Sequence, residues 1–273
     1  MSSQNSSSAS TKTSTKFRHS KVTLLLYVYC ELKIDFQEDT CFVGKNKSVI
    51  VWHMGKRKLG IIDAKQKQMI YVIPEFTENM IMRKMIGMNS KSWIVTLEVV
   101  DKREKNVTAI HCFDILTKKS IYKAECASEV NQLGQQDSTV YRFTKSIELS
   151  TNEEVIFTVG VYVHDLPSEP EQKGFINAMR ILDGSGKEEA IRIIGEASHA
   201  EKKGMYRVSK CTKDDTLIVG GWIDVFVFIY ADGYFEHLHS FLTIHNAFIY
   251  NVIAFDNCFF TCSNDCEASL IEF

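Results

Sequence analysis

The chain has 273 residues, of which 45% are hydrophobic and 24% are charged, a composition typical of globular domains and unlike that of disordered or fibrous chains. Its 32 basic and 34 acidic residues give a formal net charge of -2, so the chain lacks the overall basic field that nucleic acids or anionic membranes attract. No apolar run approaches the roughly 20 residues that a membrane-spanning helix needs. We therefore expect no nucleic-acid partner and no membrane span.

The amino terminus and the cysteines bear on where the protein works. Residues 1–21 are rich in Ser and Thr and contain basic but no acidic residues. This composition predicts a disordered polar tail, although a mitochondrial presequence has the same features. Most of the eight cysteines lie in apolar runs, which favours free thiols in a reducing compartment. We expect a cytoplasmic protein, with a mitochondrial location as the alternative.

Beyond residue 21 the apolar segments are short and rich in Val, Ile, Phe and Tyr, and many of them alternate with polar residues. Clear examples are residues 48–52, 93–97 and 155–159. Such residues fit the pleated surface of a sheet, and no stretch of 12 or more residues carries a convincing helical stripe. The sequence therefore predicts an all-β fold.

These predicted strands recur in units along the chain, which is the mark of a repeat architecture. Paired apolar runs occupy residues 41–53, 93–114, 155–183, 217–229 and 259–273. A further apolar run follows three of them, at residues 58–62, 120–122 and 190–194, and is interpreted as a fourth strand. The longer spacing of the middle units is interpreted as insertions near residues 101–106 and 164–174.

Two histidines identify the repeat more closely. His199 precedes the apolar run 205–210, with Asp224 further on, and His245 precedes the run 249–255, with Ser263 and Asp265 further on. This pattern resembles the WD-repeat (WD40-like) β-propeller, whose blades carry a His before the innermost strand and an Asp in the turn after the second. The Trp-Asp pair that closes the third strand of such blades is altered in this chain, to Trp52-His53, Phe113-Asp114, Leu182-Asp183 and Ile271-Glu272.

The resemblance implies a single WD40-like β-propeller domain over residues 22–273, preceded by a disordered tail over residues 1–21. It would have about five four-stranded antiparallel blades. Because the last unit stops after its third strand, we expect Val22–Tyr29 to pair beside Ser269–Phe273 and so complete the last blade. Rings of this family usually have seven blades. A small divergent propeller, an incomplete chain and one part of a larger propeller or complex therefore all stay open.

The resemblance also implies that the matched polar residues have a structural role. His199, Asp224, His245, Ser263 and Asp265 would form the family's hydrogen-bond network between strands. No Gly-x-Ser-x-Gly or Cys-x-x-Cys motif is present, and the phosphate-loop pattern at residues 183–187 is incomplete. We therefore expect no catalytic residue, no metal ion and no cofactor. The alternative is a propeller enzyme with its site at the central opening.

Charged turns are the remaining candidates for function. The basic turns contain Lys56, Arg57, Lys58, Lys118 and Lys119, and the acidic one contains Asp165, Glu169 and Glu171. We expect both basic turns to join third to fourth strands on one face of the disc, and the acidic turn to lie on the opposite face. The sequence therefore predicts a non-catalytic protein-protein interaction scaffold that docks peptides or proteins.

Overall fold

A computed structural model describes the chain over residues 18–21, 40–44, 49–54, 58–63, 68–73, 80–102, 105–126, 129–130, 140–164, 172–181, 191–199, 204–211 and 213–272. Within these ranges every regular element is a β-strand, and the strands form five antiparallel sheets. The prediction of an all-β fold with about five blades is confirmed. The same ranges contain no helix that is long and apolar enough to cross a membrane.

The sheets follow one another in chain order, and we number them from first to fifth. The first contains β2 (Thr40–Val43), β3 (Val49–Met54), β4 (Lys58–Asp63) and β5 (Gln68–Ile73). The second contains β6 (Met80–Gly87), β7 (Trp93–Lys102), β8 (Lys105–Asp114) and β9 (Lys119–Cys126). The third contains β11 (Val140–Leu149), β12 (Val155–His164), β13 (Gln172–Ile181) and β14 (Ile191–His199), with the short β10 (Glu129–Val130) beside β11. The fourth contains β15 (Arg207–Lys210), β16 (Thr216–Gly220), β17 (Val225–Ala231) and β18 (Tyr234–Phe241). The fifth contains β19 (Ile249–Ala254), β20 (Cys258–Ser263), β21 (Ala268–Glu272) and β1 (Arg18–Lys21).

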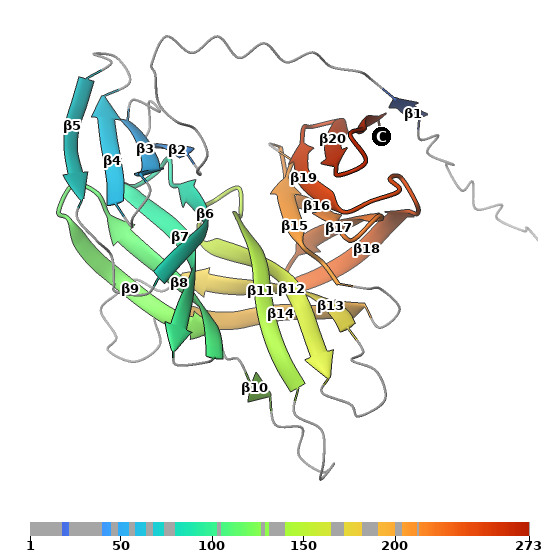
Figure 1. Ribbon diagram of the computed structural model, residues 1–273, viewed down its shortest axis with the longest axis horizontal. Coiled ribbons are helices and arrows are strands. Elements are labelled where there is room, and N and C mark those ends of the chain that lie inside the picture. Colours follow the sequence, from blue (N-terminus) through green and yellow to red (C-terminus); the bar gives the residue numbers. More distant parts are fainter. Residues whose placement is uncertain are drawn as a thin grey trace, which may run out of the picture.

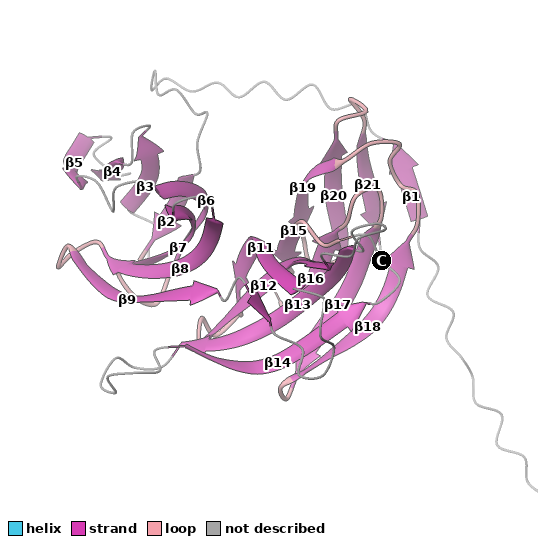
Figure 2. Cartoon of the chain, turned by 60° about the horizontal axis from the view of Figure 1, so that its bottom comes forward, coloured by secondary structure: helices cyan, strands magenta, loops and turns pink. Residues whose placement is uncertain are grey.

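The five sheets are arranged in an arc, with the first sheet in blue and the fifth in red at its two ends (Figure 1). Figure 2 shows the same succession from another side, with the strands of each sheet running next to one another. The strands β6, β11, β15 and β19 are each the first strand of a four-stranded meander. They contact one another in turn and line the inside of the arc.

The hydrophobic core lies between neighbouring sheets and is divided into four clusters. Fully buried Leu97 and Ile110 of the second sheet pack with Ile147 and Ile156 of the third, for example. Each cluster buries alternate residues of facing strands, which is what the period of a β-strand provides. Among the described residues, no such cluster joins the fifth sheet to the first.

The fifth sheet is completed by a strand from the other end of the chain. Arg18–Lys21 pair antiparallel with Ser269–Glu272, so that β1 is the fourth strand of the last sheet. Closure by an amino-terminal strand was expected, but the paired segment lies directly before Val22–Tyr29, which is outside the described residues. The boundary at residue 21 is also wrong at its last four positions, because Arg18–Lys21 belong to the propeller and not to a disordered tail.

Two other sequence predictions need correction. In the first sheet, the runs taken as second and third strands are the first and second, β2 and β3, because β5 (QMIYVI) was not recognised as a strand. Trp52-His53 therefore ends the second strand and not the third. Residues 101–106 are not an insertion either: β7 and β8 are long, and Asp101 pairs with Asn106 close to the end of their hairpin.

Candidate functional site

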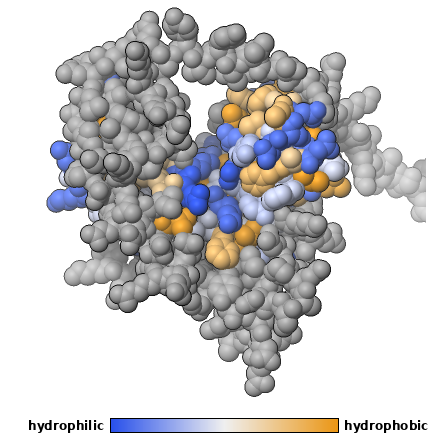
Figure 3. Space-filling view, viewed as in Figure 1, coloured by the Kyte–Doolittle hydropathy of each residue, from blue (hydrophilic) through white to orange (hydrophobic). Residues whose placement is uncertain are grey.

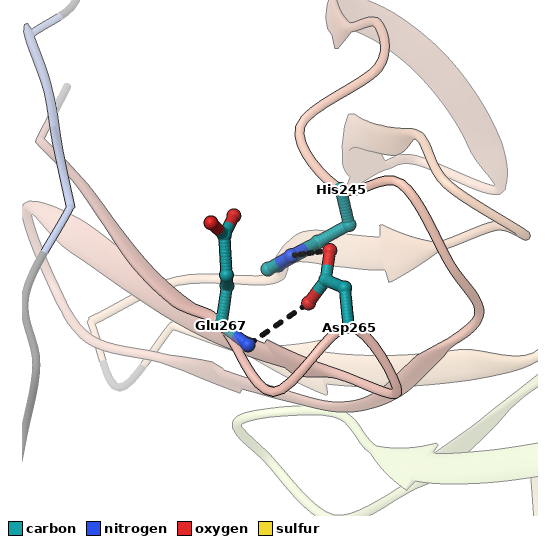
Figure 4. A group of neighbouring side chains, drawn as sticks. All are labelled: His245, Asp265 and Glu267. Atoms are coloured by element: carbon teal, nitrogen blue, oxygen red, sulfur yellow. Dashed lines mark hydrogen bonds and ion pairs between the residues drawn. The ribbon is translucent and has the colours of Figure 1, made fainter.

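A buried polar network surrounds His245, just before β19. Its Nδ1 lies 3.2 Å from Asp265 Oδ2 and its Nε2 lies 2.8 Å from Thr261 Oγ1, and the imidazole is almost completely buried. Figure 4 shows His245 and Asp265 facing each other, with Glu267 beside them. Asp265 also accepts hydrogen bonds from the amides of Asn246 and Glu267, each at 2.9 Å. The network therefore joins the segment before β19 to the turn after β20.

Electrostatics in this network favour an ionised Asp265. Burial acts to raise the pKa of its carboxyl, but the two amide bonds and the neighbouring imidazole outweigh burial and lower the pKa to about 2. A carboxylate that accepts several amide hydrogen bonds behaves in this way because those bonds favour its charged form.

The hydroxyl in contact with the imidazole is not the one that the sequence suggested. The Ser263 hydroxyl donates to the Ala247 carbonyl at 2.9 Å and accepts from the Asp265 amide at 3.3 Å, so it binds the turn backbone. Thr261 lies two residues earlier on the same face of β20 and provides the hydroxyl to His245.

The second expected pair, His199 with Asp224, is described only in part. Asp224 accepts a hydrogen bond from the Thr243 amide at 2.7 Å and so fixes the turn after β18. The backbone of His199 ends β14 opposite Gly174, but its side chain lies outside the described part of the structure. The contact between His199 and Asp224 stays a prediction.

The second sheet holds a polar network that the sequence did not predict. Glu98 is fully buried on β7, with Oε1 3.0 Å from His111 Nδ1 and Oε2 2.8 Å from Lys123 Nζ. The Thr96 hydroxyl donates to the same carboxylate at 2.9 Å, and His111 Nε2 lies 2.8 Å from Ser120 Oγ. Burial raises the pKa of Glu98, but the hydrogen bonds and charges of His111 and Lys123 outweigh it, so the pKa falls below the usual 4.5.

Both networks have the chemistry of structural links. In each, the imidazole nitrogens are both engaged by neighbouring side chains inside the sheet. His245, Asp265 and Glu267 bring their ligand atoms within 4.8 Å of one another, which a cation could use. However, Asp265 and His245 already bind each other, and Asp265 also binds backbone amides. The polar atoms of His245 and Asp265 are therefore already hydrogen-bonded within the chain.

A cavity of about 790 Å³ opens between the inner strands of the second to fifth sheets. Its wall is formed by side chains of several strands: Arg83, Lys84, Val99, Thr108, Phe143, Thr144, Lys145, Ser146, Tyr206, Arg207, Phe248, Tyr250 and Asn251. Figure 3 shows hydrophilic residues gathered at the centre of this face, between the sheets. The described wall contains four cationic side chains and no carboxylate or imidazole.

The cations are held at defined places on this wall. Arg207 donates from Nε to the Tyr250 carbonyl at 2.6 Å, and its guanidinium carbon lies 5.6 Å from the centre of the Phe248 ring. Lys84 Nζ donates to the Val208 carbonyl at 3.1 Å. The Lys145 pKa is lowered, first by loss of water around the ammonium group and then by the charges of Arg83 and Arg207. The charges of Arg83 and Arg207 therefore act on the Lys145 ammonium group.

Three of the inner strands are bulged at the cavity. The strand register shifts around Arg83 in β6, around Lys145 in β11 and around Tyr250 in β19, so each of these residues is the extra one of its strand. A regular strand turns every second side chain away, whereas a bulge redirects side chains locally. Consecutive residues, such as Arg83 and Lys84, can therefore line the same cavity.

An aromatic cluster borders the cavity. The rings of Tyr206, Trp222 and Phe248 pack edge to face at centroid distances between 5.2 and 6.2 Å, and Tyr250 adjoins Phe248 at 6.0 Å. We call these four residues the aromatic ridge. Trp222 is 54% exposed and Tyr250 is 52% exposed, so much of the ridge faces solvent.

The two basic turns belong to different types of connection. Lys118 and Lys119 are exposed in the third-to-fourth turn of the second sheet, as expected, but Lys58 begins β4, the third strand of the first sheet. Residues 56–58 therefore belong to a second-to-third connection. The first-to-second turns of these sheets lie together, because the Gly44 amide donates to the Met88 carbonyl at 3.0 Å. Successive turns of an antiparallel meander alternate between its ends. The expected connection type is therefore wrong for the first of the two turns, whereas a basic patch formed by both turns stays a prediction.

The acidic connection, with Asp165, Glu169 and Glu171, joins β12 to β13, the second and third strands of the β11–β14 meander. It therefore has the connection type that was expected. Its residues, together with Lys56, Arg57 and the side chain of Lys58, lie outside the described part of the chain.

No protein-family model and no curated protein matches the sequence. Among solved structures, the WD40 domain of Pan2 from Neurospora crassa is similar, with a TM-score of 0.54 at 10% sequence identity. The match covers 86% of this chain and 62% of that one, so this chain spans less than two thirds of its length. The Cps50 (Swd1) β-propeller domain of Myceliophteria thermophila matches over 85% of this chain and 82% of its own, at 6% identity and a TM-score of 0.49. The successive antiparallel sheets and the match to the Pan2 domain together show that this chain has the fold of a WD40 β-propeller.

Proposed function

We propose that this chain is a non-catalytic protein-interaction scaffold that docks a segment of a partner protein on the aromatic ridge. The observation that carries the proposal is the exposure of Trp222 and Tyr250 next to the Arg207 guanidinium. Tryptophan, tyrosine and arginine are the residues that most often dominate binding energy at protein interfaces. A contiguous cluster of exposed aromatic rings, unlike a single exposed ring, is typical of a surface that a partner covers.

The positive charge beside the aromatic ridge indicates which kind of partner segment would bind there. The ridge borders a wall with four cations and no carboxylate among its described residues. Positive potential at an interface favours a partner of negative charge and speeds its association. We therefore propose a segment that carries an aromatic or aliphatic anchor next to acidic side chains.

The same observations favour docking over the enzyme alternative. An acid-base site would be expected to place carboxylates or imidazoles at the central opening. In the carboxylate-imidazole pairs that the structure describes in the second and fifth sheets, the imidazoles are instead buried and hydrogen-bonded through both ring nitrogens to neighbouring side chains.

The test compares Trp222→Ala with Tyr234→Ala, which removes an aromatic side chain that is 79% exposed at the start of β18 and outside the ridge. Partners are captured with the full chain from its own cells and identified. Binding constants are then measured with the purified partner. We expect Trp222→Ala to weaken binding at least tenfold, about 1.4 kcal/mol, and Tyr234→Ala to leave it unchanged. Equal affinity of both variants for every identified partner would contradict the proposal.

The charged turns are a second candidate surface, since Lys118 and Lys119 are both exposed. We propose that they add electrostatic attraction to an acidic partner, and that the acidic connection with Asp165, Glu169 and Glu171 does so for a basic one. Because exposed charges mainly change association rates, charge reversal at Lys118 and Lys119 should slow association and leave dissociation almost unchanged.

A further inference from the structure

The central cavity carries chemistry that protein docking does not require. Four cationic side chains converge on it from three strand regions, with Arg83 and Lys84 on β6, Lys145 on β11 and Arg207 on β15. Like charges gathered around one cavity attract an anion into it. No described residue of the wall provides a carboxylate.

Buried hydroxyl groups supply an independent observation. Among the described residues, four buried hydroxyls have no hydrogen-bond partner, and two of them, Thr108 and Thr144, line this cavity. Their side chains are at least nine-tenths buried. Leaving a buried hydroxyl unpaired costs free energy, so native structures usually provide a partner. Both oxygens have almost no accessible surface, so a ligand oxygen would reach them only after the threonine side chain turns toward the cavity.

The bulges explain how one cavity collects so many polar groups. Arg83 and Lys145 are the extra residues of β6 and β11, and each is followed or flanked by another polar residue of the wall. Bulges are frequent next to binding sites because they redirect a side chain that the strand would otherwise point elsewhere. The cationic wall is thus built into the inner strands and does not depend on flexible loops.

Size and chemistry indicate the class of ligand. A volume of about 790 Å³ falls in the range of pockets that bind small organic molecules. Guanidinium and ammonium groups together with hydroxyl donors are the groups with which proteins bind phosphates. Phe143, Tyr206 and Phe248 add apolar surface for the organic part of a ligand. We propose that this cavity binds a multiply phosphorylated organic molecule of low molecular mass.

The binding experiment uses the full chain and inorganic tripolyphosphate as the probe for the anionic part of the ligand. Titration calorimetry at low salt should show saturable binding at one site, and the affinity should fall as salt is added. Arg83→Gln and Lys145→Gln should each weaken binding about tenfold. Lys213→Gln, which removes an exposed cation outside the cavity, should bind as the parent does.

A hydroxyl variant separates ligand binding from folding. Thr144→Val keeps the shape of the side chain and removes an unpaired buried hydroxyl, so the free protein should melt at the same or a higher temperature. If the hydroxyl donates to phosphate, the same variant should bind tripolyphosphate about tenfold more weakly. A variant that is less stable and binds the probe unchanged would overturn this role.

Three results would overturn the proposal. The first is no saturable binding by the parent protein at millimolar tripolyphosphate. The second is equal loss in Lys213→Gln and Lys145→Gln, which would indicate nonspecific attraction. The third is tight binding of a doubly phosphorylated peptide without binding of tripolyphosphate, which would assign the cavity to a protein partner. Trp222→Ala should retain tripolyphosphate binding, so failure of the docking proposal and failure of this one can be distinguished.

Discussion

Among the described residues, Glu98 is a carboxylate with surroundings very different from water. It is fully buried and meets both His111 and Lys123 at hydrogen-bond distance. A buried charge of this kind is tolerated because its partners stand in for water. If one of the three side chains is removed, the remaining charged groups stay buried without a partner. The free-energy cost of such a removal is larger than the stability that a buried ion pair adds over apolar residues of the same size.

We predict that Glu98→Gln lowers the free energy of unfolding at neutral pH by about 3 kcal/mol. The pKa of Glu98 is lower in the folded chain than its usual 4.5. Its ionised form therefore stabilises the fold above that value, and this stabilisation is lost as the pH falls through the folded pKa. The difference between variant and parent should accordingly shrink in acid. Denaturant unfolding at several pH values measures it, with exposed Glu236→Gln as the control.

Single residues also differ in whether the sequence alone could predict their role. His245 and Asp265 were recognisable because their spacing from the strands resembles a known repeat. Glu98 and His111 were not, because their contact depends on the register of two long strands, in which Glu98 pairs with Ala109 and not with His111. Arg83 and Lys84 left one signal, two cations inside the apolar run Met80–Gly87.

At the scale of elements, the bulged inner strands are the strands that are hardest to predict from sequence patterns. An extra residue breaks the alternation of buried and exposed positions, so β6 reads as a weak helical stripe and not as a strand. Because the alternation is missing, neither β6 nor the part of the cavity wall that it forms was predicted from the sequence. The same effect does not disturb β7 and β8, whose mutual pairing is regular over ten residues, and both were recognised.

Gly160 supports the bulge of β11 from the neighbouring strand. It pairs with Thr144 next to the extra residue Lys145, and a β-carbon at this position would collide with the Phe143 carbonyl and lie 2.6 Å from the Phe175 ring. We predict that Gly160→Ala destabilises the chain by about 2 kcal/mol, because the backbone and ring must both move. The same change should weaken tripolyphosphate binding by shifting Lys145.

Gly221→Ala is the matched control for Gly160→Ala, because its added methyl group would meet no atom closer than 3.1 Å. Thermal unfolding of both variants provides the comparison. A melting temperature of Gly160→Ala equal to that of the parent protein would show that the strand beside the bulge accommodates a side chain.

At the scale of the whole molecule, the fifth sheet depends on residues from both ends of the sequence. The polar segment Arg18–Lys21 was not recognisable as a strand, since it has no apolar alternation and gains its place only by pairing with β21. The order of the sheets, by contrast, could be predicted from the repeated apolar runs. Tertiary pairing decides such edge strands, which is why composition assigned these residues to a tail.

We predict that deletion of residues 1–21 exposes the edge of β21 and accelerates amide hydrogen exchange over residues 268–272. Deletion of residues 1–17 keeps β1 and should preserve the exchange rates of the parent. Exchange measured by mass spectrometry on both truncated chains distinguishes them. If both deletions leave β21 equally protected, β1 does not contribute to the last sheet.

The pairing of β1 with β21 also sets the order of events during synthesis. The first strand leaves the ribosome about 250 residues before its partner, which at roughly 5 to 20 residues per second means a wait of about 12 to 50 s. The first four sheets are made entirely of segments translated in that interval, and each can pair as it emerges. The last sheet alone must wait until β21 has been translated, so a chain that stopped before β19 would contain the first four sheets and an unpaired amino-terminal strand.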